Sequence, residues 1–183
     1  MTSLTLPNIN NLPTAVQQRL HSLPPINVYR MIANAPQCVI PWTDMVSALY
    51  QSSVSIRYRE IAILRQASQA KSPYELHQHQ FIARANGITQ VEINHICDAS
   101  PVTHLSNVEN LLCQMADELE NTATINDDTM AQLKTHFNTT ELTELIILTS
   151  FYCCVARVLN ATGVTIEKDN PLKDASSPIN EQE

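Results

Sequence analysis

The sequence predicts an all-α protein, and three observations lead to that prediction. Apolar residues recur at spacings of three and four along the chain, which is the period of an amphipathic helix. No run of alternating β-branched residues lies between glycine turns, so the pattern typical of strands is missing. Both glycines, Gly87 and Gly163, directly follow helical patterns, where a left-handed residue ends a helix.

A single helical domain is expected at residues 14–163, with residues 1–13 as an N-terminal arm and residues 164–183 as a polar C-terminal tail. The apolar period predicts nine helices, at 14–22, 25–34, 37–52, 57–70, 73–86, 90–98, 106–121, 127–137 and 140–162. Capping-box spacing marks the start of the sixth and seventh, because a hydroxyl and a carboxylate three residues apart can each satisfy a backbone donor. These pairs are Thr89 with Glu92 and Ser106 with Glu109.

Composition excludes several classes of function. The 183 residues are enough to bury a core without disulfides or structural metals. A net charge of −7 has the wrong sign for a nucleic-acid partner. Two glycines provide no material for a Gly-rich phosphate loop or a dinucleotide fingerprint.

Charge and cysteine content bear on surroundings and assembly. Charged residues make up 16% of the chain, below the roughly 25% of typical soluble domains, which favours a homo-oligomer with uncharged interfaces. The longest charge-free apolar stretch, residues 145–156, is too short to cross roughly 30 Å of hydrocarbon, so no membrane partner is expected. Irregularly spaced cysteines and the lack of a signal-peptide pattern favour the cytoplasm.

Three polar residues fall on the apolar faces of two consecutive predicted helices. Glu60 shares a stripe with Leu64 and Ala67, and no Lys or Arg stands four residues after it. Glu75 and His79 both lie in the apolar arc of the next helix. One hypothesis is that the three side chains meet in a partly dry pocket, where burial could bring an acid and a base close to neutral pH.

A purely structural interpretation stays open for the same residues. Ser72-Pro73-Tyr74-Glu75 has the form of an N-cap, a proline at the first helical position and a capping glutamate. Glu75 would then only cap its helix, and His79 would be a hydrogen-bonded core residue with Glu60 as its partner.

Metal and thiol sites have weaker support. Glu75, His79 and His95 could ligate zinc, but no second Cys or His pair stands at ligand spacing, so no metal is expected. Cys153 and Cys154 are adjacent and would point about 100° apart on a helix, which is unsuited to a Cys-x-x-Cys redox site.

Three runs of sequence resemble the carboxymuconolactone decarboxylase family, which includes the alkylhydroperoxidase-D-like proteins. They are Arg57-Tyr-Arg-Glu60-Ile-Ala-Ile-Leu-Arg65, Tyr74-Glu75-Leu-His-Gln-His79 and Ile82-Ala-Arg-Ala-Asn-Gly87-Ile-Thr. The resemblance extends over nearly the whole chain. It implies an all-helical fold that assembles into homo-oligomers, with the active site in a cleft near subunit contacts.

The peroxidase branch of that family carries the pattern Glu-x11-Cys-x2-Cys-x3-His. Glu60 and His79 match its ends, whereas Ser72 and Glu75 stand at the positions of the two redox cysteines. Peroxide reduction by that route needs one thiolate to attack and a second thiol to resolve the product. The resemblance therefore does not extend to alkylhydroperoxidase activity.

The decarboxylase branch implies cofactor-free acid/base chemistry on a small organic acid or lactone. By that resemblance His79 is the general acid/base, Glu60 orients it, and Glu75 is a second acid/base group. Arg57 or Arg59 would bind a substrate carboxylate, although both could equally be surface or intersubunit salt-bridge residues.

Two other functions stay open. In the first, the chain is a non-catalytic, oligomeric helical binding protein in which Glu60, Glu75 and His79 only satisfy one another. In the second, a residual peroxidase uses Cys97 or Cys113.

Overall fold

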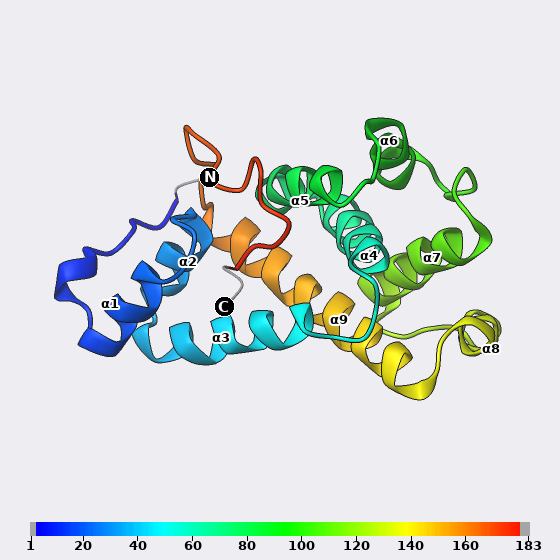
Figure 1. Cartoon of the computed structure of the whole chain (residues 1–183), viewed down its shortest axis with the longest axis horizontal. Coiled ribbons are helices and arrows are strands. Elements are labelled where there is room, and N and C mark those ends of the chain that lie inside the picture. Colours follow the sequence, from blue (N-terminus) through cyan, green and yellow to red (C-terminus); the bar gives the residue numbers. More distant parts are fainter. Residues whose placement is uncertain (1–2, 180–183) are drawn as a thin grey trace.

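The computed structural model describes residues 3–179, which are helical with no strand (Figure 1). The all-α prediction is confirmed, and each predicted helix has a counterpart whose ends differ by at most about two residues. The elements are η1 (Ile9–Asn11), α1 (Thr14–His21), α2 (Asn27–Ile32), α3 (Pro36–Tyr50), α4 (Ile56–Gln69), α5 (Pro73–Ala85), α6 (Gln90–Asp98), α7 (Asn107–Thr122), α8 (Asp127–His136) and α9 (Thr139–Thr162).

Helix α4 is the centre of the packing. Every residue from Arg59 to Ala67 is buried, because α5, α6, α7 and α9 all pack around this helix. Helices α1, α2 and α3 form a separate layer at one end of the molecule (Figure 1) and have a smaller apolar cluster of their own. Any polar side chain on the central turns of α4 must therefore find its partners inside the protein.

The predicted helix ends form as expected. Thr89 with Glu92 and Ser106 with Glu109 both make reciprocal capping boxes. Gly163 ends α9 with a φ of 64°, and Gly87 follows α5 with a φ of 82°. Such positive values strain a residue that carries a Cβ, so glycine suits both positions.

The chain after α9 turns back over the helices (Figure 1). Leu172 is buried and belongs to the same apolar cluster as Tyr29 of α2 and Val39 of α3. The Tyr29 hydroxyl donates a 2.7 Å hydrogen bond to the carbonyl of Pro178. Residues 164–179, expected from their polarity to be a tail outside the core, are therefore in contact with it.

Helix α9 is long and apolar enough to cross a membrane, by length and composition alone. Half of its most apolar window is buried inside the protein, which is the environment of a core helix.

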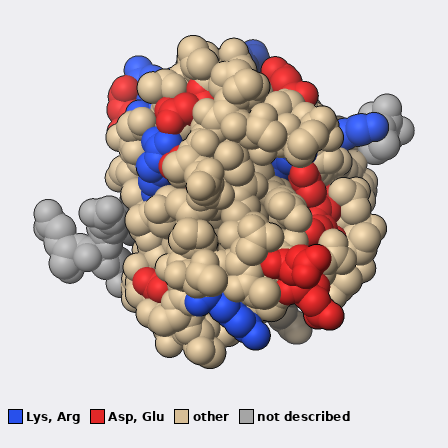
Figure 2. Space-filling view, turned by 90° about the vertical axis from the view of Figure 1, so that its right-hand side faces the viewer, with Lys and Arg blue, Asp and Glu red and all other residues tan. Residues whose placement is uncertain are grey.

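Charged side chains are sparse on the end of the molecule where α6, α7 and α8 lie. There they form scattered patches around an uncharged centre (Figure 2).

Candidate active site

Glu60 and His79 meet between α4 and α5. The Nδ1 atom of His79 lies 2.8 Å from Oε2 of Glu60, and Glu60 is fully buried. Because α4 and α5 pack side by side, the inward stripe of one helix faces that of the other. The structure thus brings together two of the three residues that the sequence pattern selected.

Two tyrosines complete the surroundings of Glu60. The Tyr50 hydroxyl donates a 2.8 Å hydrogen bond to Oε1 of Glu60, and the Tyr152 hydroxyl lies 3.5 Å from that of Tyr50. Burial, with the nearby Glu60 charge, raises the pKa of both phenols well above the ordinary value of 10, so both stay protonated and can donate. Both carboxylate oxygens of Glu60 therefore have partners.

This arrangement fixes the orientation of the His79 ring. A carboxylate oxygen accepts from the Nδ1–H of the imidazole, which leaves Nε2 as the second functional atom. Nε2 makes no hydrogen bond within residues 3–179, and the His79 side chain lines a cavity. Tyr152 packs edge-on against the ring, with centroids 5.0 Å apart.

The cavity is small and mostly apolar. It has a volume of about 40 Å³, room for about three water molecules. Its walls come from α2, α3, α5, α9 and the C-terminal segment, and they include Trp42, Val46, Phe151, Leu172 and Pro178. Such surroundings strengthen electrostatic interactions inside the cavity.

Glu75 lines the same cavity but has a different environment from Glu60. Its side chain is buried, and neither carboxylate oxygen has a hydrogen-bond partner among the described residues. Burial raises the pKa of this carboxyl well above its ordinary value of 4.5, while the nearby Ser72 hydroxyl opposes the shift without reaching hydrogen-bond geometry. Burial therefore favours the protonated, neutral form of Glu75.

The capping explanation for Glu75 does not hold. Ser72 precedes α5 in the N-cap position but makes no side-chain capping bond, and its buried hydroxyl has no partner. Glu75 and Ser72, which stand at the redox-cysteine positions of the resembling peroxidases, are thus a buried acid and a buried hydroxyl next to each other.

Glu167 of the C-terminal segment binds two residues of the cavity wall. One of its oxygens accepts a 2.6 Å hydrogen bond from the Tyr74 hydroxyl and also contacts the backbone N–H of Asn27. The other accepts a 2.6 Å bond from Nε2 of Gln78. Tyr74 and Gln78 both line the cavity, so Glu167 anchors the segment at its edge.

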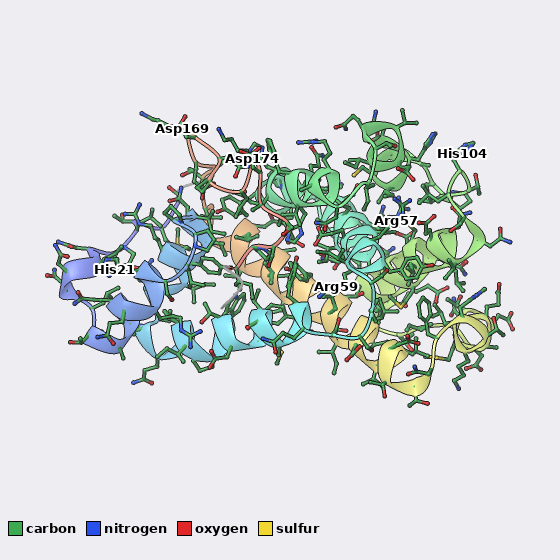
Figure 3. The ribbon with its side chains drawn as sticks, viewed as in Figure 1. His21, Arg57, Arg59, His104, Asp169 and Asp174 are labelled. Atoms are coloured by element: carbon green, nitrogen blue, oxygen red, sulfur yellow. The ribbon has the colours of Figure 1, made fainter. Side chains whose placement is uncertain are left out.

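The two arginines before Glu60 point in different directions (Figure 3). Arg57 lies toward α6 and α7, where it pairs with Glu92 at 2.5 Å and Glu109 at 2.6 Å. It lines none of the cavities described here, so the salt-bridge alternative accounts for it and a substrate-binding role has no support. Arg59 lies toward α3 (Figure 3), where its Nη1 donates to the carbonyl of Leu49 at 2.9 Å.

Thiols and metal ligands are not gathered at the cavity. Burial raises the pKa of Cys97 to about 11 and that of Cys113 to about 12, which disfavours the reactive thiolate. Within residues 3–179 no group of three His, Cys, Asp or Glu residues is placed to hold a metal ion. His95 packs instead against His104, with ring centroids 4.5 Å apart.

Tyr50, Tyr152 and Gln78 are the site residues that sequence reasoning missed. Tyr50 is the last residue of α3, ten residues before Glu60, and Tyr152 lies in the middle of α9. Both stand among the apolar residues of their helices, and tertiary packing brings them together.

Comparison with known proteins supports the fold and leaves the family open. No protein-family model matches the chain, and no curated protein does. The chain is similar to a solved structure described as an alkylhydroperoxidase AhpD core, an uncharacterized peroxidase-related protein from Ralstonia eutropha JMP134. The TM-score is 0.80 at 15% identity, covering 91% of this chain and 92% of that one.

Two further solved structures agree. An uncharacterized peroxidase-related protein from Silicibacter sp. TM1040 has a TM-score of 0.79 at 22% identity, with 91% and 92% of the two chains covered. A protein of unknown function from Agrobacterium tumefaciens, described as a putative antioxidant defence protein AhpD, has a TM-score of 0.68 at 16% identity, covering 75% of this chain and 96% of that one. The chain has the alkylhydroperoxidase-D-like fold.

Proposed function

We propose that the chain is a cofactor-free acid/base enzyme, similar to carboxymuconolactone decarboxylases, that acts on a small organic acid or lactone. One observation carries the proposal: an imidazole oriented by Glu60 and a buried carboxyl, Glu75, whose pKa is raised by burial, line the same apolar cavity. An acid and a base in one water-poor site are the requirement for proton transfer near neutral pH. Because the cavity has a volume of about 40 Å³, binding of a lactone also requires its walls to move apart. We further propose that it works as a cytoplasmic homo-oligomer, in keeping with its low charge content.

In the proposed mechanism, Glu75 and His79 are the side chains that exchange protons with the substrate. When a carboxylated lactone loses carbon dioxide, the carbon–carbon bond breaks and its electron pair stays on the ring as a dienolate. Glu75 or protonated His79 then supplies a proton to the carbon, and the side chain that donated it regains a proton from water before the next turnover. A neutral Glu75 also avoids the repulsion that an ionised carboxylate would exert on an anionic substrate.

Thiol-dependent peroxide reduction is disfavoured despite the names of the similar structures. A serine and a glutamate occupy the two motif positions, and neither can form the disulfide that the thiol route requires. The three structures show a common fold, and a fold hosts several chemistries.

The experiment is to incubate the purified protein with carboxymuconolactone and a panel of small lactones and β-keto acids. Carbon dioxide release and proton exchange in D₂O are followed by NMR. We expect His79→Gln to lose at least about 100-fold in rate. His77→Gln is the matched control, because His77 lies on the same helix, packs against Phe81 and does not line the cavity.

Equal rates of substrate turnover for His79→Gln and the wild type would contradict the proposal. If the wild type transforms none of these compounds while His79→Gln lowers the melting temperature, the non-catalytic binding protein becomes the better account. In that case the Glu60–His79 pair serves only stability.

A further inference from the structure

A second cavity lies on the other side of α3 from the first. It has a volume of about 500 Å³, and its walls come from α1, α3, the start of α4 and residues 177 and 179. Trp42 and Val46 of α3 line the first cavity, whereas Thr43 and Ser47 line the second. Its two charged wall residues are Arg19 and Arg59, and no Asp or Glu among the described residues lines it.

Arg59 is a buried cation without an anionic partner. Its side chain is among the buried residues, at 7% exposure, and no carboxylate within residues 3–179 forms an ion pair with it. One nitrogen donates to the Leu49 carbonyl, and the guanidinium lies 5.0 Å from the centre of the Tyr50 ring. The buried Nε atom has no hydrogen-bond partner.

Such an arrangement is unfavourable unless something completes it. A buried guanidinium without a counter-charge loses its hydration, and no ion pair offsets that unfavourable free energy. Arg19 does not share this state, because it pairs with the exposed Asp44 at 2.7 Å. The uncompensated charge in the wall of the second cavity is therefore that of Arg59.

We propose that the second cavity is a binding site for a small oxyanion, a carboxylate or a phosphate group, held by Arg59. A guanidinium presents parallel N–H donors that match the oxygens of either group. Ser47 also lines the cavity, and its hydroxyl, which accepts a hydrogen bond from Gln51, keeps its own proton to donate. The site is separate from the Glu60–His79 cavity, and the proposal stands whether or not that cavity is catalytic.

The position of Tyr50 places the two cavities next to each other. Its side chain lines the second cavity, and its hydroxyl donates to Glu60, the partner of His79. A ligand on Arg59 would therefore contact the ring whose hydroxyl holds Glu60 in place.

The test is calorimetric titration of the full chain with benzoate and, separately, with inorganic phosphate at constant ionic strength. We expect saturable 1:1 binding of at least one of them, and the stronger ligand identifies the carboxylate or the phosphate as the preferred group. Arg59→Gln should weaken that binding at least tenfold. Arg84→Gln is the control, because Arg84 is an exposed residue of α5 that lines neither cavity.

A second variant keeps the test decisive if Arg59→Gln does not fold. Ser47→Glu places a carboxylate on the α3 face that lines the cavity, where it can pair with Arg59. We expect it to abolish binding of the added anion and to raise the melting temperature. The proposal is overturned if neither anion binds saturably to the wild type, or if binding persists unchanged in the variants that fold.

Discussion

Arg65 on α4 and Glu75 on α5 are both ionisable and buried, yet their surroundings are opposite. Arg65 forms a two-pronged pair with Asp117 and donates to the carbonyls of Ile96 and Ala99 at 2.9 and 2.8 Å. Glu75 has no hydrogen-bond partner on either oxygen among the described residues. The first holds α4, α6 and α7 together, and the second contributes nothing comparable to its own helix.

The difference separates structural from functional polar groups. Buried polar atoms in native proteins are nearly always satisfied, so each exception needs an explanation. Here Glu75, Ser72 and Gln78 each leave a buried oxygen without a partner, and all three lie on or next to the first turns of α5. Two of them, Glu75 and Gln78, line the first cavity, where a ligand would supply the missing hydrogen-bond partners.

The largest expected loss of stability comes from replacing Arg65, the residue with hydrogen-bond partners. Arg65→Gln removes the charge that pairs with Asp117 and leaves two carbonyls without a donor, so we expect a loss of about 3–5 kcal/mol in the free energy of unfolding. Urea unfolding followed by circular dichroism measures it. Arg84→Gln, at an exposed position, should change the same quantity by less than about 0.5 kcal/mol. A similar small loss for Arg65→Gln would remove the contrast.

A pH series sharpens the contrast at Glu75. Because its folded-state pKa is raised above 4.5, the folded protein keeps a proton that the unfolded chain releases as the pH rises past that value. The contribution of Glu75 to stability is therefore fully present below pH 4.5 and falls by about 1.4 kcal/mol per pH unit above it, until the folded-state carboxyl ionises.

The matched variant for that series is Glu75→Gln, which keeps the shape of the side chain but cannot ionise. We expect the unfolding free energy of this variant, measured between about pH 5 and 8 in steps of about one pH unit, to lack the decline with pH that Glu75 causes in the wild type. Parallel curves for the wild type and Glu75→Gln would show that Glu75 is not held neutral.

The smallest expected effect compares two serines at helix starts. Ser106→Ala breaks a capping box and should cost about 1 kcal/mol. Ser72→Ala removes a hydroxyl that makes no capping bond, so a change below about 0.5 kcal/mol is expected. Thermal unfolding of the two variants side by side checks this, and an equal loss in both would mean that Ser72 does cap α5.

The fold and half of the site could be predicted because their signals are local. Helical period, capping boxes and the two glycines each depend on a few neighbouring residues, and the inward stripe was enough to select Glu60 and His79. The tyrosines near Glu60 could not be predicted, since Tyr50 contacts it across the turn between α3 and α4 and Tyr152 contacts Tyr50 from α9. The different directions of Arg57 and Arg59 likewise depend on which helices pack against α4.

The contact between residues 164–179 and the core could not be predicted for another reason. The polar composition of this segment is typical of a solvated tail, but one buried leucine, Leu172, and one well-placed carboxylate, Glu167, attach it to the core. Composition averages over a segment, whereas attachment depends on single residues.

That segment also forms part of the cavity wall from outside the helical core. Glu75 and His79, the acid and the base of the proposed mechanism, are carried by α5 in the helical core, whereas Leu172 and Pro178 supply part of the cavity wall from a stretch without regular helix. Loops tolerate substitution and changes of length far better than core helices do. Proteins of this fold could therefore change the size and shape of the molecule they accept by altering about fifteen residues at the end of the chain, while the proton-transfer groups keep their positions.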